Sequence, residues 1–195
     1  MPKKQQQVEL FIQELQRYNK THNILGRQKR SDILKEDVAD TLLFLDQFNP
    51  NTTILDIGSG AGIPGIILAI YLPGSHVYMA DKNPKKTHFI KKTTKKLGLT
   101  NTTTIHTNVN HKNQLGCYDV ITARALGPTN KIINMAEHLL KKQGRFLLYK
   151  GSIKTINSEI QKVDKNKYNI KVITPQQTTE KQRHIIRATK TPLCA

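Results

Sequence analysis

The residues with the clearest chemical potential are a carboxylate and three glycines at the end of a short β-rich segment. The run Asp56-Ile57-Gly58-Ser59-Gly60-Ala61-Gly62 closes a strand that β-branched residues predict over 52–57. Glycine allows a ligand to approach the backbone, and the helix that follows presents free N–H groups. Ligands of doubly wound sheets bind at such strand-to-helix turns. The run therefore predicts a small-molecule site at the first turn of an α/β fold.

Two classes of cofactor use a glycine turn of this kind, and the register of the glycines distinguishes them. A dinucleotide site needs G-x-G-x-x-G, which Gly60, Gly62 and Gly65 satisfy, but this match begins late and places Pro64 in the pyrophosphate turn. The other register, acid-x-Gly-x-Gly-x-Gly, is typical of S-adenosylmethionine sites and is filled by Asp56, Gly58, Gly60 and Gly62. Asp81 ends the second predicted strand, where a carboxylate can accept hydrogen bonds from ribose hydroxyls. We favour S-adenosylmethionine over a dinucleotide or a turn without a ligand.

Strands and helices alternate around this turn. An amphipathic helix is expected over about 5–20, followed by a second helix that Ser31 or Asp32 could cap. Expected strands are 52–57, 76–80, 102–107, 118–123, 144–149, about 168–174 and about 182–189, with helices at 63–72, from Pro84 to Gly98, 132–140 and about 153–164. This order predicts an α/β fold with a mostly parallel, doubly wound sheet. We expect an N-terminal helical extension over 1–48 and a Rossmann-like core over 49–195.

Charge is the strongest bulk property of the 195-residue chain. It has 31 Lys and Arg residues against 14 Asp and Glu, a formal net charge of +17. Such a field attracts polyanions, and contacts with phosphates are its usual use. The alternative is that most of these charges are merely solvated. Charge by itself does not separate RNA, DNA and anionic lipid.

The apolar runs, the N-terminal sequence and the cysteines further narrow the possible classes of protein. No run of 18 apolar residues occurs, which argues against a membrane-spanning helix, and the N-terminus lacks a secretory signal. Cys117 and Cys194 lie far apart, so neither a disulfide framework nor a zinc site is expected. We therefore expect a monomeric cytoplasmic protein that binds neither metal nor membrane.

Further segments along residues 10–151 are characteristic of one family. They are Tyr18-Asn-Lys-Thr-His-Asn23, Leu55-Asp-Ile-Gly-Ser-Gly-Ala-Gly-Ile-Pro-Gly65, Asp81 with Lys85-Lys86 and Phe89, Thr122-Ala-Arg-Ala125, Gly144-Arg-Phe and Lys150-Gly151. In these segments the chain resembles the RsmG (GidB) family, the bacterial small-subunit rRNA guanine-N7 methyltransferases. The resemblance implies a class I methyltransferase fold with S-adenosylmethionine as cofactor. It also implies that 16S rRNA, methylated in the decoding-region loop, or a small-subunit assembly intermediate is the substrate.

The resemblance also assigns site residues. It implies that the cofactor is bound by Gly58, Gly60, Gly62, Ile63, Asp81, Val109, Asn110 and Arg124. Of these, Val109 and Asn110 would border the adenine, and Arg124 would contact cofactor or substrate. The chain departs from the family pattern where Asn108 and Asn110 replace an arginine and an acid, and where Asp37 replaces a histidine. An amide can still bond an adenine edge, so these departures affect substrate recognition more than cofactor binding.

Methylation of guanine N7 needs no general base, because N7 carries an exposed lone pair. Alignment of that atom with the methyl group supplies most of the effect, so no catalytic residue is required, and Arg124 is the one candidate. Its guanidinium can bind a phosphate or a carboxylate; the alternative is an ion pair with Asp56 that stabilises the glycine turn. The segments that accompany methylation of exocyclic amines or of cytosine C5 are not found in the sequence.

Basic residues near the expected site form a candidate RNA-binding rim. They are Arg27, Lys29, Arg30 and Lys150, with the lysines of 82–96 as further candidates. His22 is either functional or a helix cap. Two alternatives remain at this stage: a catalytically silent RNA-binding module that kept the fold, and a methyltransferase for another substrate.

Overall fold

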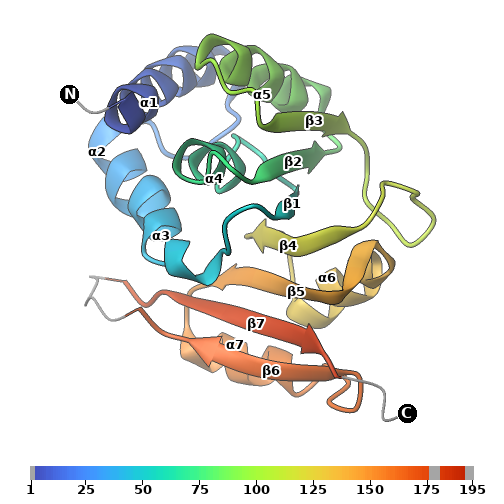
Figure 1. Ribbon diagram of the computed structural model, residues 1–195. Coiled ribbons are helices and arrows are strands. Elements are labelled where there is room, and N and C mark those ends of the chain that lie inside the picture. Colours follow the sequence, from blue (N-terminus) through green and yellow to red (C-terminus); the bar gives the residue numbers. More distant parts are fainter. Residues whose placement is uncertain (1–2, 176–180, 192–195) are drawn as a thin grey trace.

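Seven strands form one sheet in the computed structural model of the chain, which describes residues 3–175 and 181–191 (Figure 1). The strands are β1 (Thr53–Ile57), β2 (His76–Asp81), β3 (Thr102–His106), β4 (Tyr118–Arg124), β5 (Leu140–Lys150), β6 (Tyr168–Ile173) and β7 (His184–Lys190). Their order is β3-β2-β1-β4-β5-β7-β6. All neighbours pair in parallel except β7, which is antiparallel to both β5 and β6. The predicted α/β fold with a mostly parallel sheet is confirmed.

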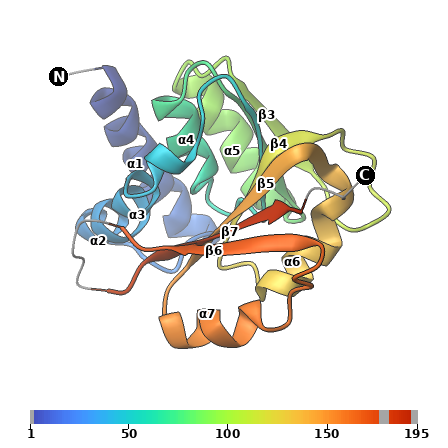
Figure 2. The ribbon, with the colours of Figure 1, turned by 60° about the horizontal axis from the view of Figure 1, so that its bottom comes forward.

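Helices cover the two faces of the sheet (Figures 1 and 2). They are α1 (Lys3–His22), α2 (Arg30–Ile33), α3 (Ala39–Leu42), α4 (Gly65–Tyr71), α5 (Pro84–Lys96), α6 (Thr129–Ala136) and α7 (Ile153–Ile160), with a π-helical turn over Leu34–Val38 and short 3-10 turns at Leu45–Gln47 and Glu137–Leu139. Residues of α1, α4 and α5 share one buried apolar cluster with one face of the sheet, and residues of α6 and α7 share another with the opposite face. No helix in the described part of the chain is both long and apolar enough to cross a membrane.

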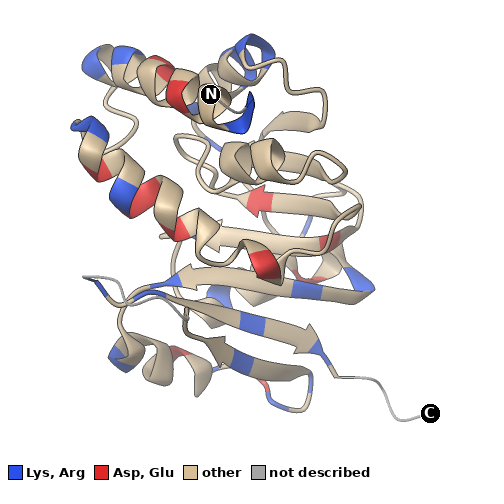
Figure 3. Cartoon of the chain, turned by 60° about the vertical axis from the view of Figure 1, so that its left-hand side comes forward, with Lys and Arg blue, Asp and Glu red and all other residues tan. Residues whose placement is uncertain are grey.

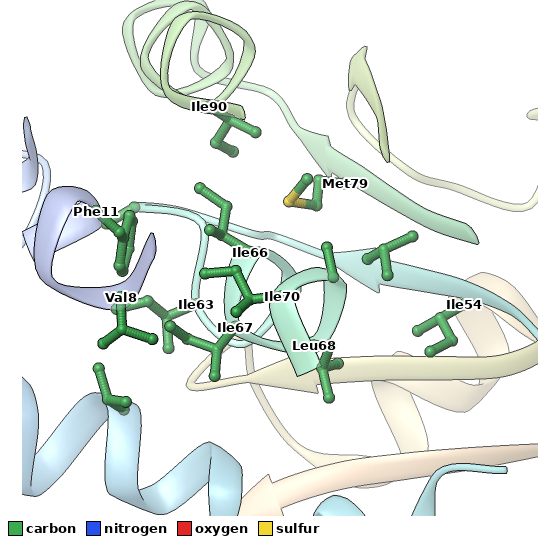
Figure 4. Packing of buried hydrophobic residues seen from close by; sticks show 14 of the residues in the cluster. Val8, Phe11, Ile54, Ile63, Ile66, Ile67, Leu68, Ile70, Met79 and Ile90 are labelled. Atoms are coloured by element: carbon green, nitrogen blue, oxygen red, sulfur yellow. The ribbon is translucent and has the colours of Figure 1, made fainter. Parts of the chain in front are cut away.

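The N-terminal extension packs directly on the helix that follows the glycine turn. Val8 and Phe11 of α1 lie against Ile63 and Ile66 (Figure 4), and Phe11 and Ile66 are fully buried. Each such side chain stabilises the fold by roughly 1.5–3 kcal/mol through burial. Tyr18 extends this contact to α5, since its hydroxyl donates to the Lys85 carbonyl at 3.0 Å. The extension is therefore held at the edge of the sheet where the site was expected.

Several boundaries differ from those expected. The second helix begins at Arg30 with Lys29 as its N-cap and no side-chain cap, so the prediction of Ser31 or Asp32 as the cap was wrong. Arg30 is placed there by a tertiary contact, an ion pair with Glu9 of α1 at 2.6 Å. Strand β5 starts at Leu140 instead of residue 144, because pairing with β4 continues beyond an irregularity in the register.

Other local predictions are confirmed. Pro84 opens α5, and Asn83 caps it by accepting a hydrogen bond from Lys85 N at 2.9 Å. Gly98 ends the same helix with a φ of +65°, a conformation that favours glycine. Cys117 is exposed, whereas Cys194 lies outside the described residues.

Candidate active site

The glycine turn adopts a conformation that requires its glycines. Gly58, Gly60 and Gly62 have φ values of +68°, +57° and +84°, a region that costs other residues energy. A Cβ on Gly60 would meet only the Gly58 carbonyl within 4 Å, at 3.7 Å, so this part of the turn is open. A Cβ on Gly58 would lie 2.6 Å from Leu126 Cδ1. The turn thus leaves its backbone accessible on one side and is closely approached by Leu126 on another.

The side chain of Asp56 fixes the backbone that follows this turn. Its Oδ2 accepts a hydrogen bond from Gly65 N, the first residue of α4, at 3.1 Å. The side chain is completely buried and its Oδ1 has no partner in the structure. Burial, opposed by hydrogen bonds from Ser59 and Gly65, raises the pKa of Asp56 to about 7. A role for Asp56 in organising the backbone is thereby supported by geometry.

This buried carboxyl predicts a pH dependence. Because the pKa in the folded chain lies above the ordinary value of 3.8, the unfolded state loses its proton first as the pH rises. The stability that Asp56 contributes is therefore greatest below about pH 4 and falls as the pH approaches 7. Asp56→Asn does not titrate and keeps an acceptor for Gly65 N, so we expect its free energy of unfolding to rise relative to wild type over this window. At about 1.4 kcal/mol per pKa unit the gain reaches a few kcal/mol.

Urea unfolding of both proteins at several pH values between 4 and 8 measures this difference. Other carboxyls titrate in both proteins, so only the difference between the two curves reports on Asp56. Parallel curves across the whole range would show that Asp56 titrates normally.

Asp81 lies at the end of β2, beside the turn. Its Oδ2 accepts from Gly60 N at 2.9 Å and its Oδ1 accepts from Asn83 N at 2.8 Å. A carboxylate has about four lone-pair positions, so capacity for ribose hydroxyls remains. Val109 is buried nearby, whereas Asn110 makes local bonds: its Nδ2 donates to Asn108 O and its Oδ1 accepts from Lys112 N. An open glycine backbone with a carboxylate beside it fits the ribose and methionine portions of S-adenosylmethionine.

Arg124 lies at the end of β4 and makes a different ion pair from the one considered in the sequence. Its Nη1 is 2.6 Å from Oδ1 of Asp37, in the π-helical turn between α2 and α3, whereas no ion pair joins it to Asp56 in the described chain. Asp37 is fully buried, and Arg27 also reaches its Oδ1, at 3.3 Å. Two guanidinium groups therefore share one carboxylate oxygen, while Oδ2 of Asp37 is unpartnered.

Further charged residues surround this pair and connect the extension to the segment just before β7. Glu36 bonds Arg27 at 2.8 Å and also pairs with Lys181, and Arg183 Nε lies 2.6 Å from Asp40 Oδ2. None of these acids was identified in the sequence as a site residue. Asp37 was noted only as a departure from the family pattern, and its partners lie 10 and 87 positions away along the chain.

The charged residues line a cavity of about 670 Å³ at the carboxyl ends of β4 and β5. Its walls include Leu25, Arg27, Glu36, Asp40, Phe44, Arg124, Pro128, Tyr149, Lys150, Glu159, Arg183 and His184. Ala125 and Gly127 also line it, and Leu126 between them contacts Gly58. The segment 125–127 thus lies between the cavity and the glycine turn.

The predicted RNA-binding residues differ in whether a carboxylate pairs with them. Arg27 is engaged with Glu36 and Asp37, Arg30 with Glu9, and Lys150 lies 2.6 Å from Glu159 and donates to the Gly127 carbonyl. Lys29 is exposed and makes no ion pair within the described residues. No group of three or more His, Cys, Asp or Glu side chains in the described ranges is suited to hold a metal ion.

Comparison with known proteins decides the family. The sequence model for rRNA small subunit methyltransferase G (GidB) matches residues 4–186. The chain belongs to this family. Ribosomal RNA small subunit methyltransferase G of Brachyspira hyodysenteriae is 36% identical to it over 171 residues, which are 87% of this chain and 82% of the relative. The predicted S-adenosylmethionine-dependent rRNA methyltransferase is confirmed, and the dinucleotide interpretation is set aside.

Solved structures agree on the fold of this family member. A SAM-dependent methyltransferase from Aquifex aeolicus superposes with a TM-score of 0.63 at 15% identity, covering 83% of this chain and 94% of that one. M. jannaschii TYW2 in complex with AdoMet superposes with a TM-score of 0.57 at 20% identity, covering 79% and 74% of the two chains. The class I methyltransferase fold is therefore confirmed, while the roles of individual residues stay predictions.

Proposed function

We propose that this methyltransferase modifies N7 of a guanine in the decoding-region loop of 16S rRNA, in the cytoplasm. The observation that carries the proposal is the 670 Å³ pocket beside the glycine turn, lined by both cations and carboxylates. Guanine offers hydrogen-bond donors at N1 and at its exocyclic amine and an acceptor at O6. A wall with both kinds of charge can satisfy all of these groups while leaving N7 free.

The cofactor is proposed to occupy the open side of the glycine turn. The residues that would hold it are Gly58, Gly60, Gly62, Ile63, Asp81, Val109, Asn110 and Arg124. When bound, S-adenosylmethionine supplies a methyl group on a positively charged sulfur. Glycines at φ values from +57° to +84° leave room for it, and Asp81 offers oxygen atoms for ribose hydroxyls. Leu126, which contacts Gly58, would shield this region from water.

The carboxylates that line the pocket are proposed to recognise the guanine base that accepts the methyl group. Asp40 is the best-placed group for the guanine donors, because Arg183 holds its Oδ2 at 2.6 Å and thereby orients the carboxylate. Arg124 is held by Asp37 at the boundary between pocket and turn, where its charge can bind a phosphate or the O6 atom. No residue has to remove a proton from N7. Catalysis is then a matter of orienting the base and excluding water.

The RNA rim is proposed to consist of Arg27, Lys29, Arg30 and Lys150. Arg27 and Lys150 line the pocket, although each is also paired with a carboxylate, so they would mainly frame the opening. Lys29 and Arg30 are exposed at the start of α2, next to Arg27 in the chain. Phosphate contacts of this kind position an RNA without reading its sequence.

Transfer of a radioactive methyl group from S-adenosylmethionine tests the proposal. We expect incorporation into 16S rRNA or small subunits that lack the modification, and mass spectrometry of the digested RNA should identify 7-methylguanosine. Incorporation into another nucleoside would contradict the N7 assignment. The same assay on naked RNA and on assembled subunits identifies which of the two is the substrate.

A further inference from the structure

One part of the sheet is left without a covering helix. Ile186 of β7 and Phe146 of β5 belong to the core beneath α6 and α7. Because side chains alternate along a strand, their odd-numbered neighbours face the other side. On that side α4 and α5 lie over β1 to β3 (Figures 1 and 2), while Leu147, Tyr149 and Ile185 are buried in the apolar cluster that also contains Phe44 and Phe48. The remaining part of this face is polar and is half-buried at Arg145 and Arg187 and exposed at Lys171.

Three cations lie on this polar part of the face, one from each strand. They are Arg145 of β5, Arg187 of β7 and Lys171 of β6, which we call the basic strip; Figure 3 shows basic positions on each of these three strands. The register places Arg187 directly opposite Lys171. Arg145 is paired with Thr189, two residues along β7 from Arg187. Arg187 and Lys171 therefore lie side by side, and Arg145 lies diagonally across from Arg187 on the neighbouring strand.

The basic strip is electrostatically unfavourable for the isolated protein. Like charges that lie directly opposite each other on paired strands destabilise a sheet. Burial and the nearby Arg187, opposed by Asp119, lower the pKa of Arg145. No ion pair in the described residues involves Arg145, Lys171 or Arg187, and the only side-chain hydrogen bond found for them runs from Arg145 to the Gln47 carbonyl at 3.0 Å.

A group of cations without an ion pair among the described residues fits a polyanion. Arg187 lies three residues from His184, which lines the substrate pocket, a separation of about 10 Å along the strand. An RNA whose guanine enters the pocket has to continue over the neighbouring surface. Phosphates would neutralise the repulsion between Arg187 and Lys171 and would release counterions on binding.

We propose that the basic strip binds the phosphate backbone of the rRNA substrate outside the pocket. The proposal rests on the rRNA substrate proposed above. Its test measures binding without methyl transfer, so that a failure of the strip and a failure of the N7 assignment can be told apart. The substrate would thus be held at two places, by the rim at the pocket and by the strip on the sheet.

The test uses a double variant, Lys171→Gln with Arg187→Gln, because Lys171 is exposed, Arg187 is partly exposed and neither makes an ion pair with a described residue. The probe is a fluorescent 16S rRNA fragment that contains the decoding-region loop, and its binding is measured by fluorescence anisotropy. The salt concentration is varied from about 0.05 to about 0.3 M, a range that includes physiological ionic strength. Loss of two phosphate contacts should reduce the slope of log K against log salt by about 1.5 to 2. At about 0.1 M salt this is roughly a 30-fold loss of affinity.

A matched control removes the same charge elsewhere. Lys162→Gln with Lys165→Gln changes two exposed lysines in the turns between α7 and β6, and its RNA affinity and salt slope should stay at the wild-type values. Equal losses in both double variants would overturn the proposal, because only the net charge would then matter. An unchanged slope in the strip variant would also overturn it and would favour an acidic protein as the occupant.

A single charge reversal separates binding from folding. Arg187→Glu places a carboxylate opposite Lys171, so the melting temperature should equal or exceed that of wild type while RNA affinity falls. Binding of S-adenosylmethionine should be unchanged in this variant, because Arg187 lies away from the glycine turn. A lower melting temperature together with unchanged RNA affinity would show that Arg187 has a structural role instead.

Discussion

Replacing Gly58 with aspartate is expected to abolish saturable binding of S-adenosylmethionine. The new side chain would start at a φ of +68°, a conformation that strains any residue with a Cβ, and its Cβ would lie 2.6 Å from Leu126 Cδ1, so the Leu126 side chain must rotate away. It would also add a negative charge close to Asp56 and Asp81. We expect the affinity to fall by more than about 100-fold, about 2.7 kcal/mol of binding free energy. Calorimetric titration of the purified protein measures this directly.

Gly98→Asp is the matched control for this variant. Gly98 has nearly the same backbone conformation, with a φ of +65°, and a Cβ there would meet nothing within 4 Å. It lies at the end of α5, away from the turn, so its substitution should cost about 1 kcal/mol of stability and leave cofactor affinity unchanged. If both variants bound the cofactor as wild type does, the glycine turn would not be the cofactor site.

The ion pair between Arg124 and Asp37 should be the most strongly coupled pair in the chain. Their atoms are 2.6 Å apart, Asp37 is fully buried and the Arg124 side chain is 19% exposed. Asp37→Asn would leave the Arg124 charge without its carboxylate, and Arg124→Gln would leave the buried Asp37 with only Arg27 at 3.3 Å, each at a cost of about 3 kcal/mol. The double variant removes both charges, so we expect a coupling energy of about 2 kcal/mol from urea unfolding of the four proteins.

The pair between Glu9 and Arg30 provides a control cycle of similar geometry. Its atoms are also 2.6 Å apart, but the two side chains are 28% and 53% exposed. Exposed pairs of this kind contribute about 0.2–1 kcal/mol. A coupling energy for Asp37 and Arg124 as small as that of the control would mean that water reaches their pair, and Arg124 would then not be held by the extension.

The cycle also tests activity, because the resemblance predicts that Asp37 replaces a histidine of the family. In this chain the carboxylate attracts both Arg124 and Arg27, and it is the contact that joins the extension to the end of β4. Asp37→Asn should therefore weaken the orientation of Arg124 without altering the glycine turn. Cofactor binding by this variant distinguishes the two proposed roles of Arg124: it stays near wild type if Arg124 serves the RNA, and it falls if Arg124 serves the cofactor.

Much of the fold was predictable because local patterns dominate it. The order of strands and helices follows from hydrophobic periodicity, and the turn at Gly58 follows from the spacing of its glycines. The ends of the helices and strands were predicted less accurately. The start of α2 depends on the contact of Arg30 with Glu9, and the early start of β5 depends on pairing with β4, neither of which a local pattern contains.

The sequence by itself determined the fold class, the position of the glycine turn and the resemblance to one family. These features depend on residues close together in the chain, where backbone conformation and side-chain alternation act locally. Only the tertiary structure showed that Arg124 pairs with Asp37 instead of Asp56, and that Arg187 lies opposite Lys171. Charge interactions fall off with distance in space and not along the chain, so partners 87 positions apart become visible only once the sheet and the extension are assembled.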